Sequence, residues 1–340
     1  MTRGADTTLP QAWLRRGLLA RLLWPVSLVF HALTAARRSA YRAGLLQSTR
    51  LPVPVIVVGN IFVGGTGKTP LTIWLVEELR RAGFVPGVIS RGYGAKNDAP
   101  LEVLPTSAPA EVGDEPALIA RRAKCPVVIG RRRVEAGRTL LAAHPEVNVI
   151  VSDDGLQHYP LQRDVEIVLC DERGNGNGWL LPAGPLREPP TRPRDFTVFN
   201  AASVPEGIPR QAARMELAGE SAEPLSGDAK PIALRELAGQ GRRIVAAAGI
   251  GNPSRFFSML RSAGLKIDEL PLPDHYDFSD NPFANITADI ILVTEKDAVK
   301  CTRIDTINND PRIWVVPVTA RIDRALAERI VEKCRGRPTA

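Results

Sequence analysis

Residues 53–79 read VPVIVVGNIFVGGTGKTPLTIWLVEEL and contain the most informative pattern in the chain. A β-branched run at 53–58 predicts a strand, a glycine-rich loop at 64–67 follows, and apolar residues at helical spacing come next. Glycines let backbone N–H groups close on phosphate oxygens, and the first turn of a helix adds a partial positive charge. Lys68 is then placed to reach the β- and γ-phosphates, and the Thr69 hydroxyl to bind Mg²⁺. The stretch therefore predicts a nucleoside triphosphate site.

The loop departs from the commonest phosphate-binding spacing at one position. The pattern G-x-x-x-x-G-K-[ST] asks for glycine at 62, where this chain has Phe62, so the loop resembles a GG-x-GKT variant instead. A glycine-rich turn that binds no phosphate is the alternative, which Gly-Lys-Thr between a strand and a helix disfavours. The residues expected to contact ATP are Val63, Gly64, Gly65, Thr66, Gly67, Lys68, Thr69 and Pro70.

The composition is that of an ordinary globular protein, but its charge is unevenly distributed. Of 340 residues, 44% are hydrophobic and 24% are charged, and the net charge is +7. The first 50 residues hold eight arginines and one acid, Asp6, so the rest of the chain is nearly neutral. We expect no nucleic-acid partner. The four cysteines lie far apart without C-x-x-C spacing, which indicates neither a zinc site nor a disulfide framework and fits a reducing cytoplasm.

The basic segment at the N-terminus has a helical pattern. Residues 9–46 are rich in Leu, Ala and Arg and predict helix, broken or kinked at Pro25. Residues 22–36 carry no formal charge, and this run of 15 residues is shorter than the ~20 that span a bilayer. An interfacial helix drawn to anionic lipid is the favoured interpretation. A helix pair packed on the protein is the second, and an export signal, imitated by Arg15-Arg16, is the third.

From residue 53 onward, strand and helix patterns alternate, which predicts a parallel sheet of the P-loop NTPase type with helices on both faces. Strands are expected at 53–58, 85–90, 126–130, 147–152 and 165–170, with helices at 69–82, 115–124 and 131–143. Residues 171–195, rich in Gly and Pro, interrupt the alternation and read as an ordered loop and then a linker.

A second, smaller α/β set is expected after this linker. Its strands are expected at about 196–199, 243–248, 265–270, 289–293 and 312–316, and its helices near 253–263, 295–300 and 320–333. The predicted division is therefore a basic, membrane-associating segment at 1–50, a P-loop domain at 51–195, and a second α/β domain at 196–340 that closes over the site.

Acidic residues fall where a parallel sheet places its chemistry, at the carboxyl ends of strands. Asp153 and Asp154 follow an apolar run, so one could bind Mg²⁺ and the other the acceptor or a metal-bound water. His158 is a candidate local partner. Asp114 opens a helix and is either a dipole partner or the carboxylate that accepts the proton of an attacking hydroxyl. His275 lies between acids in the second set and is either structural or a contribution of that set to the site.

With these motifs in order, the chain resembles the tetraacyldisaccharide 4'-kinase family, the lipid A 4'-kinases of Gram-negative bacteria. The resemblance runs from about residue 11 to about residue 320 and rests on a set of motifs of which any one is modest but the order is specific. They are GN-x-x-VGGTGKTP (59–70), SRGYG (90–94), GDEP (113–116), DDGLQH (153–158), RDVEIV (163–168), NGWLLPAGPLRE (177–188), HYDF (275–278) and TEKDAVK (294–300). The family's loop also lacks the first glycine.

The resemblance implies an activity and a place for it. It implies phosphorylation of the 4'-hydroxyl of tetraacyldisaccharide 1-phosphate with ATP and Mg²⁺, at the cytoplasmic face of the bacterial inner membrane, by a peripheral or monotopic protein. The implied partners are the lipid substrate and an anionic membrane surface, with no required protein partner. An acyl substrate held in the bilayer also gives the basic N-terminal segment a purpose.

The resemblance further implies roles for individual residues. The base role falls on Asp114, and the full expected catalytic set is Lys68, Asp114, Asp153, Asp154 and His275. The expected metal ligands are Thr69, Asp153 and Asp154. The expected substrate contacts are Arg91, Gln157, Arg187 and Glu188.

Two other classes of protein share the phosphate loop. A P-loop ATPase or GTPase that acts as a switch or metal-delivery factor would couple hydrolysis to a protein partner and would not need a lipid-facing arm. A soluble small-molecule kinase or ligase would act on a water-soluble acceptor without detergent. A phosphoryl-transfer assay with the lipid separates all three classes.

Overall fold

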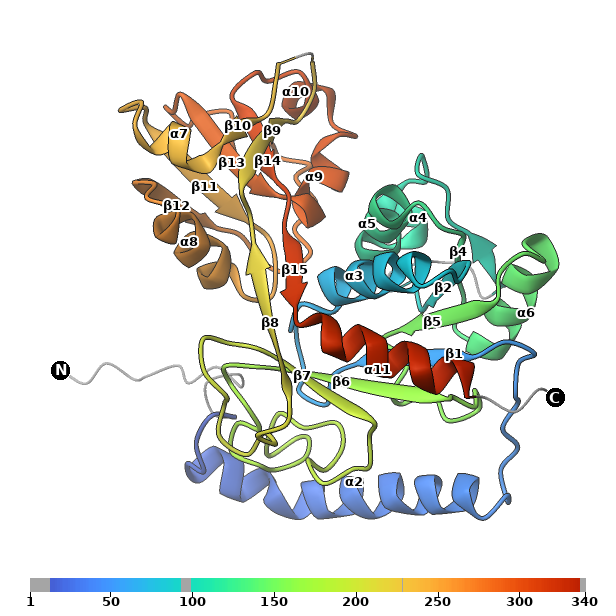
Figure 1. Cartoon of the computed structure of the whole chain (residues 1–340). Helices are drawn as coiled ribbons and strands as arrows, with labels where there is room; N and C mark the ends of the chain where they lie inside the picture. Colours follow the sequence, from blue (N-terminus) through green and yellow to red (C-terminus); the bar gives the residue numbers. More distant parts are fainter. Residues whose placement is uncertain (1–12, 93–98, 228, 337–340) are drawn as a thin grey trace.

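The computed structural model describes residues 13–92, 99–227 and 229–336 and contains two sheets joined by paired strands (Figure 1). The first sheet has nine strands in the order β15-β8-β7-β6-β1-β5-β2-β4-β3. Its strands are β1 (Val55–Gly59), β2 (Pro86–Ser90), β3 (Leu101–Glu102), β4 (Val127–Ile129), β5 (Val149–Asp153), β6 (Val165–Asp171), β7 (Phe196–Asn200), β8 (Ala213–Ala218) and β15 (Thr319–Ile322). The strands from β8 to β4 pair in parallel, and β15 and β3 are antiparallel edges.

Helices cover both faces of the first sheet. One face packs against α3 (Lys68–Arg81), α5 (Asp114–Ala123) and α11 (Arg324–Arg335), and the other against α6 (Arg133–Ala143). The short helix α4 (Pro109–Val112) precedes α5. All five residues of β1 are buried, because this β-branched strand lies at the middle of the sheet with a core on each side. The predicted parallel sheet with helices on both faces is confirmed.

The second sheet is smaller and has the strand order β10-β9-β14-β13-β11-β12. Its strands are β9 (Ser221–Pro224), β10 (Ile232–Ala233), β11 (Ile244–Ala248), β12 (Ile267–Pro271), β13 (Ile290–Thr294) and β14 (Ile313–Val316). Its helices are α7 (Leu234–Ala238), α8 (Pro253–Ser262), α9 (Glu295–Cys301) and α10 (Asp305–Asn308). The chain crosses from the first sheet to the second between β8 and β9, and it returns between β14 and β15 (Figure 1). The two crossings lie side by side, because β8 pairs with β15 and β9 pairs with β14.

Two assignments from the sequence are wrong, one of a strand to its sheet and one of the start of a helix. The strand expected at 196–199 was placed in the second set, but β7 pairs in parallel with β6, so a boundary between residues 195 and 196 would separate paired strands. The helix expected at 320–333 begins later, because residues 319–322 form β15 and Asp323 caps α11 by accepting a hydrogen bond from the Ala325 N–H. We propose that the two sheets mark two domains, with the crossing strands shared between them.

The N-terminal segment forms one long helix, α2 (Leu18–Arg42), which lies along the first sheet's side of the molecule (Figure 1). Residues 1–12 of the segment lie outside the described part. The helix continues through Pro25, where a break or kink was predicted. Pro25 is exposed, so water can satisfy the carbonyl that loses its N–H partner. Ser27 anchors the helix, because its hydroxyl donates to the Leu180 carbonyl and accepts from the Ala183 N–H, both at 2.9 Å.

Candidate active site

The glycine-rich loop joins β1 to α3 and is held by a buried asparagine. The amide of Asn60 donates to the carbonyls of Phe62, at 2.6 Å, and Gly64, at 2.9 Å. Gly64 and Gly67 have φ angles of 103° and 96°, a left-handed conformation that favours glycine. Phe62 occupies the place of the missing glycine and is buried in the core beneath the Arg173 guanidinium, 4.3 Å from its ring. The conformation of the loop is thus set largely by neighbouring residues, namely Asn60, Gly64 and Gly67.

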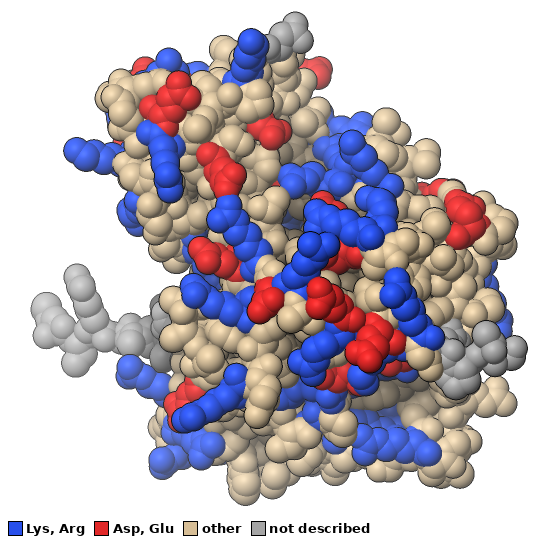
Figure 2. Space-filling model, viewed as in Figure 1, with Lys and Arg blue, Asp and Glu red and all other residues tan. Residues whose placement is uncertain are grey.

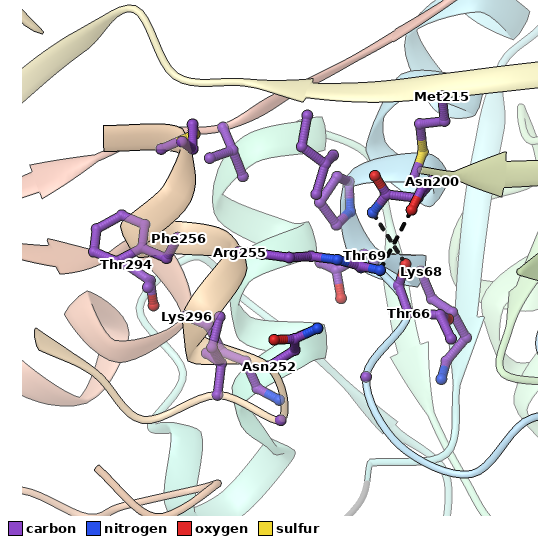
Figure 3. Close-up of a pocket in the computed structure, with 18 of the residues that line it drawn as sticks. Thr66, Lys68, Thr69, Asn200, Met215, Asn252, Arg255, Phe256, Thr294 and Lys296 are labelled. Atoms are coloured by element: carbon purple, nitrogen blue, oxygen red, sulfur yellow. Dashed lines mark hydrogen bonds between the residues drawn. The ribbon is translucent and has the colours of Figure 1, made fainter. Parts of the chain in front are cut away.

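Lys68 and Thr69 stand in the first turn of α3, as the loop pattern predicts. The Lys68 ammonium lies 3.3 Å from the Asn60 side-chain oxygen and 3.5 Å from an Asp154 carboxylate oxygen. Asn200, at the end of β7, donates to the Thr66 carbonyl at 3.3 Å, so a neighbouring strand also steadies the loop (Figure 3). These contacts hold the Lys68 ammonium at the N-terminus of α3, where the helix dipole is positive. Such a position is suited to binding phosphate.

Asp153 ends β5 next to β1, so its carboxylate lies in the same sheet edge as the loop. It is fully buried and accepts hydrogen bonds from the hydroxyls of Thr72, at 3.2 Å, and Ser90, at 3.3 Å. Burial, followed by the nearby charges of Glu115 and Asp154, raises the pKa of Asp153 to about 7.

Asp154 follows with a φ of 49°, an uncommon conformation that turns its carboxylate toward cations. One of its oxygens lies 3.5 Å from Lys68 and 3.6 Å from Arg187. Burial raises the pKa of Asp154, but the charges of Lys68, Arg187 and Arg133 outweigh burial and leave the pKa below its usual value. The pKa values of the two adjacent acids are therefore shifted in opposite directions, and Asp154 is the more firmly ionised.

The first turn of α5 meets the second sheet through two acids. The Asp114 carboxylate lies 3.2 Å from His275 Nδ1 and 3.2 Å from Lys300 Nζ. The neighbouring Glu115 lies 3.2 Å from Lys296 Nζ. His275 has a φ of 61°, and its backbone N–H donates to the Gly249 carbonyl at 3.2 Å. The sequence alone leaves His275 open between a structural role and a contribution to the site, and in the structure it lies against Asp114, the candidate base.

The residues predicted to contact substrate are divided between two environments. Arg187 lies at the acid pair, and Arg91 is exposed at the end of β2. Glu188 is only 2% exposed and accepts hydrogen bonds from Gln157, Tyr159 and Arg192. The same carboxylate lies 3.6 Å from Arg38 of α2. Glu188 and Gln157 thus belong to a network that joins α2 to the loop after β5, and their contact with substrate stays a prediction. Tyr93 and Gly94 of the SRGYG motif lie outside the described residues.

His158 does not contact the acid pair. Its Nε2 accepts a hydrogen bond from the Arg133 N–H at 3.3 Å. Burial, together with the charges of Arg133, Arg163, Arg37 and Arg91, lowers the pKa of His158 to about 4. Its imidazole is therefore neutral at pH 7 and serves as an acceptor for the start of α6.

This depressed pKa predicts an acid-sensitive contribution to stability. An unfolded histidine titrates near pH 6.5, so between about pH 6.5 and 4 the unfolded chain binds a proton that the folded chain does not. Stability from this group is present above pH 6.5 and is lost as the pH falls. We expect His158→Gln to flatten the dependence of unfolding free energy on pH between 4 and 6.5, measured by urea denaturation. Equal slopes for the two proteins between pH 7 and 8 serve as the internal control, and an unchanged slope at acid pH would contradict the assignment.

A cavity of about 620 Å³ lies between the two sheets (Figure 3). The loop from Gly65 to Pro70 forms one side, and residues of α8, α9 and the crossing strands form the other. The second sheet approaches closely, since a β-carbon added at Gly251 would lie 3.2 Å from the Gly65 nitrogen. Apolar side chains from both sides complete the wall, among them Ile73, Leu118, Met215, Phe256, Met259 and Val316. A polar phosphate end and an apolar end in one cavity suit a nucleotide.

The residues present fit an oxygen-bound cation beside phosphate. The Thr69 hydroxyl and the carboxylates of Asp153 and Asp154 are hard oxygen donors of the kind that Mg²⁺ prefers. One oxygen of Asp154 is buried and faces the two cations Lys68 and Arg187, at 3.5 and 3.6 Å. No cluster of three or more His, Cys, Asp or Glu side chains suited to a metal occurs among the described residues. Such a cluster is not required, because Mg²⁺ in kinase sites takes several ligands from phosphate and water.

Several residues of this site were not assigned a role from sequence. Lys296 and Lys300 stand in the TEKDAVK motif, but only the fold brings them to Asp114 and Glu115. Asn60 is the second residue of the motif at 59–70, and Asn200 belongs to none of the family motifs. The spacing of the two lysines, four residues apart, was a usable signal, since such residues share one helix face.

Known proteins that are similar to this chain are kinases, which agrees with the phosphate loop and the nearby acids of this site. The family model described as tetraacyldisaccharide-1-P 4'-kinase (LpxK) matches residues 19–335. A tetraacyldisaccharide 4'-kinase of Janthinobacterium sp. (strain Marseille) is 64% identical over 98% of this chain and 97% of its own length. One from Herminiimonas arsenicoxydans is 61% identical over 97% of this chain and 96% of its own.

A solved structure is also similar along nearly the whole chain. It is described as the "apo" form of LpxK from Aquifex aeolicus in complex with ATP, with a TM-score of 0.76 and 30% sequence identity. The match covers 94% of this chain and 99% of that one. The agreement of sequence, fold and family model over almost all residues shows that this chain belongs to the tetraacyldisaccharide 4'-kinase family.

Proposed function

We propose that this protein transfers the γ-phosphoryl group of ATP to the 4'-hydroxyl of a tetraacyldisaccharide 1-phosphate. The observation that carries the proposal is the meeting of the phosphate loop, the Asp153-Asp154 pair and the Asp114–His275 contact around one sheet edge, in a chain of this family. The alternative of a switch or metal-delivery factor is not favoured, since the similar proteins are named as kinases along the full length of the chain.

The proposed mechanism assigns a task to each group. Lys68 neutralises the β- and γ-phosphates, because it is held at the start of α3 within reach of the loop. Asp114 accepts the proton of the attacking sugar hydroxyl, and His275 and Lys300 hold its carboxylate in place.

Thr69, Asp154 and Asp153 would hold Mg²⁺. The ion supplies charge neutralisation at the phosphate oxygens when it is bound. Arg187 lies beside Asp154 and is placed to orient the acceptor or the phosphates.

The test of this function is a phosphoryl-transfer assay. Purified protein with MgATP and the tetraacyl disaccharide in detergent should give a product with one added phosphate. The expected result is transfer to the lipid with little hydrolysis in its absence. Hydrolysis stimulated only by a protein partner, or transfer only to water-soluble acceptors, would favour one of the other two classes.

We also propose that α2 holds the protein on the cytoplasmic face of the bacterial inner membrane as a peripheral or monotopic protein. By length and composition this helix could cross a membrane, and only 11% of its most apolar window is buried. Leu18, Leu22, Val29 and Leu33 share one side of the helix and are 77%, 68%, 59% and 66% exposed. We call this set the apolar stripe. The lower edge of the face in Figure 2, where α2 lies, is mostly uncharged, with basic side chains along it.

The basic residues of this segment divide into two groups. Arg16 lies 5.1 Å from the Trp179 ring centroid, Arg37 lies 5.8 Å from that of Tyr159, and Arg38 pairs with Glu188, so all three contact the protein. The exposed arginines suited to anionic lipid are Arg15, Arg21 and Arg42.

The apolar stripe makes a direct prediction about membrane binding. Val29→Asp should lower binding to vesicles that contain anionic lipid by about tenfold or more, because it removes an exposed apolar side chain that the bilayer would bury and places a charge in the interface. Leu104→Asp is the matched control, since Leu104 is 53% exposed but lies outside α2. Flotation with vesicles measures both. Equal flotation of the wild type and Val29→Asp would favour a helix that serves only to pack on the protein.

A further inference from the structure

We infer that Lys296, in the first turn of α9 beside the second sheet, is a phosphate-binding residue of the nucleotide site, which gives up its ion pair with Glu115 when ATP enters. The inference deepens the proposed function and rests on it, because it takes ATP as the nucleotide. Lys296 belongs to the TEKDAVK motif at 294–300, and the proposed phosphoryl transfer assigns it no other role.

The first observation is the position of Lys296 in the cavity. It lines the same cavity as Lys68, from the opposite side, so the two ammonium groups approach one space from two sheets (Figure 3). Lys68 is 10% exposed at its side chain and Lys296 is 18% exposed. Two partly desolvated cations facing one space indicate a multiply charged anion between them.

The other cations on the wall are committed or turned to solvent. Among the described lining residues the remaining ones are Arg214 and Arg255. Arg255 forms ion pairs with Glu172 and, at 3.4 Å, with the buried Asp171. Arg214 is 53% exposed. Lys296 differs from Arg255 in that its ion pair involves no fully buried carboxylate, since Asp171 is 0% exposed and Glu115 is 33% exposed.

The backbone under Lys296 is fixed, so its charge has a defined place. Thr294 caps α9 by accepting from the Asp297 N–H, and its hydroxyl donates back to the Asp297 carboxylate at 2.7 Å. Asp297 is fully buried and also accepts from the Gly249 N–H at 2.9 Å. A rigid first turn of this kind presents a side chain with little loss of conformational freedom on binding.

Lys296 also keeps its charge in the cavity. Burial lowers its pKa, but the charges of Glu115, Asp274 and Asp114 outweigh burial, so the pKa lies above its usual value. The triphosphate carries several negative charges and competes well against the single carboxylate of Glu115. The exchange would also draw α9 toward the nucleotide, since Lys296 is attached to the second sheet.

The companion lysine on the same helix face has a different environment. Lys300 pairs with Asp114 at 3.2 Å, lies 3.7 Å from Asp297 and sits 5.5 Å from the centroid of the Phe278 ring. It does not line the cavity. Helix α9 therefore presents one lysine to the nucleotide and the other to the candidate base, so the two positions can be separated by experiment.

The test compares nucleotides that differ in phosphate number. Binding of ATP, ADP, AMP and adenosine is measured by calorimetry for the wild type, Lys296→Gln, Lys296→Arg and Lys266→Ala. Lys266 is an exposed lysine that directly precedes β12 of the second sheet, and it is the control. We expect Lys296→Gln to weaken ATP binding by about tenfold to a hundredfold, the usual effect of losing a hydrogen bond to a charged group. Adenosine binding should be unchanged, and Lys296→Arg should keep part of the ATP affinity.

Lys300→Gln supplies a second comparison. It should lower turnover without a similar loss of ATP affinity, because Lys300 contacts Asp114 and not the cavity. The inference is overturned if Lys296→Gln binds ATP as the wild type does. It is also overturned if the variant loses ATP and adenosine equally, which would indicate a structural role. Since these readouts need no lipid, failure of the wild type to phosphorylate the disaccharide would overturn the proposed function while leaving the Lys296 result independent.

Discussion

Lys68→Ala is expected to lower kcat/KM for ATP by about 10²–10³-fold, the loss seen when one preorganised electrostatic contact to a transition state is removed. The reason lies in the surroundings of the ammonium group. Asn60 and Asp154 hold it in the first turn of α3, so its position is set before the nucleotide binds. The variant also removes one of the two cations that pair with Asp154 and leaves Arg187, so the negative charge of the acid pair is less well neutralised.

The measurement is steady-state kinetics over a range of ATP concentrations, with Lys266→Ala as the control lysine. Full activity in Lys68→Ala would remove the basis for the phosphate-loop assignment.

Thr69→Ala should chiefly raise the Mg²⁺ concentration needed for half-maximal activity, since a hydroxyl ligand and not a charge is removed.

Local patterns explain why the first sheet was predictable from sequence. The β1–loop–α3 unit is specified by residues within 53–79, where a buried strand, glycines with positive φ and an amphipathic helix follow one another. The same is true of the acids after β5, because a carboxylate that ends a buried central strand must lie at the sheet edge. Information of this kind lies in neighbouring residues and needs no knowledge of the tertiary fold.

The errors arose where pairing between distant segments decides the structure. β7 follows a Pro-rich linker and looks like the start of a new domain, yet it pairs with β6. Residues 319–322 look like the first turn of a helix, but they pair with β8, a strand about 100 residues earlier. The lysines of α9 reach Asp114 and Glu115 across more than 180 residues. The motif predicts that Glu188 contacts substrate, and only the fold reveals its four protein partners, Arg38, Gln157, Tyr159 and Arg192.

The roles of the acids lead to the second large prediction. Asp114→Ala should lower turnover by about 10²–10⁴-fold, the range for a positioned general base, while MgATP affinity stays nearly intact. Asp114 is held by His275 and Lys300 of the second sheet and not by the phosphate loop, which fits contact with the acceptor. His275→Ala should lower turnover to a smaller extent, and raising the pH should not restore it if the imidazole only positions the carboxylate.

Asp153 and Asp154 are expected to behave differently from Asp114, because they contact α3, the helix of the phosphate loop, through Thr72 and Lys68. Asp154→Ala should shift the Mg²⁺ dependence most, since its carboxylate is ionised and is 29% exposed, whereas that of Asp153 is fully buried. Asp153→Ala should shift it less, because the hydroxyls of Thr72 and Ser90 already occupy its oxygens. Partial rescue by Mn²⁺ would identify the residue that contacts the metal.

The deciding measurement is turnover against Mg²⁺ concentration for all four variants side by side. Asp114→Ala should lower the plateau without moving the midpoint, and Asp154→Ala should move the midpoint. If Asp114→Ala alone moves the midpoint, the roles are exchanged, and the base is then Asp153 or Asp154. Of these, Asp154 would be the better base, because its side chain is 29% exposed, whereas Asp153 is fully buried and its oxygens accept hydrogen bonds from Thr72 and Ser90.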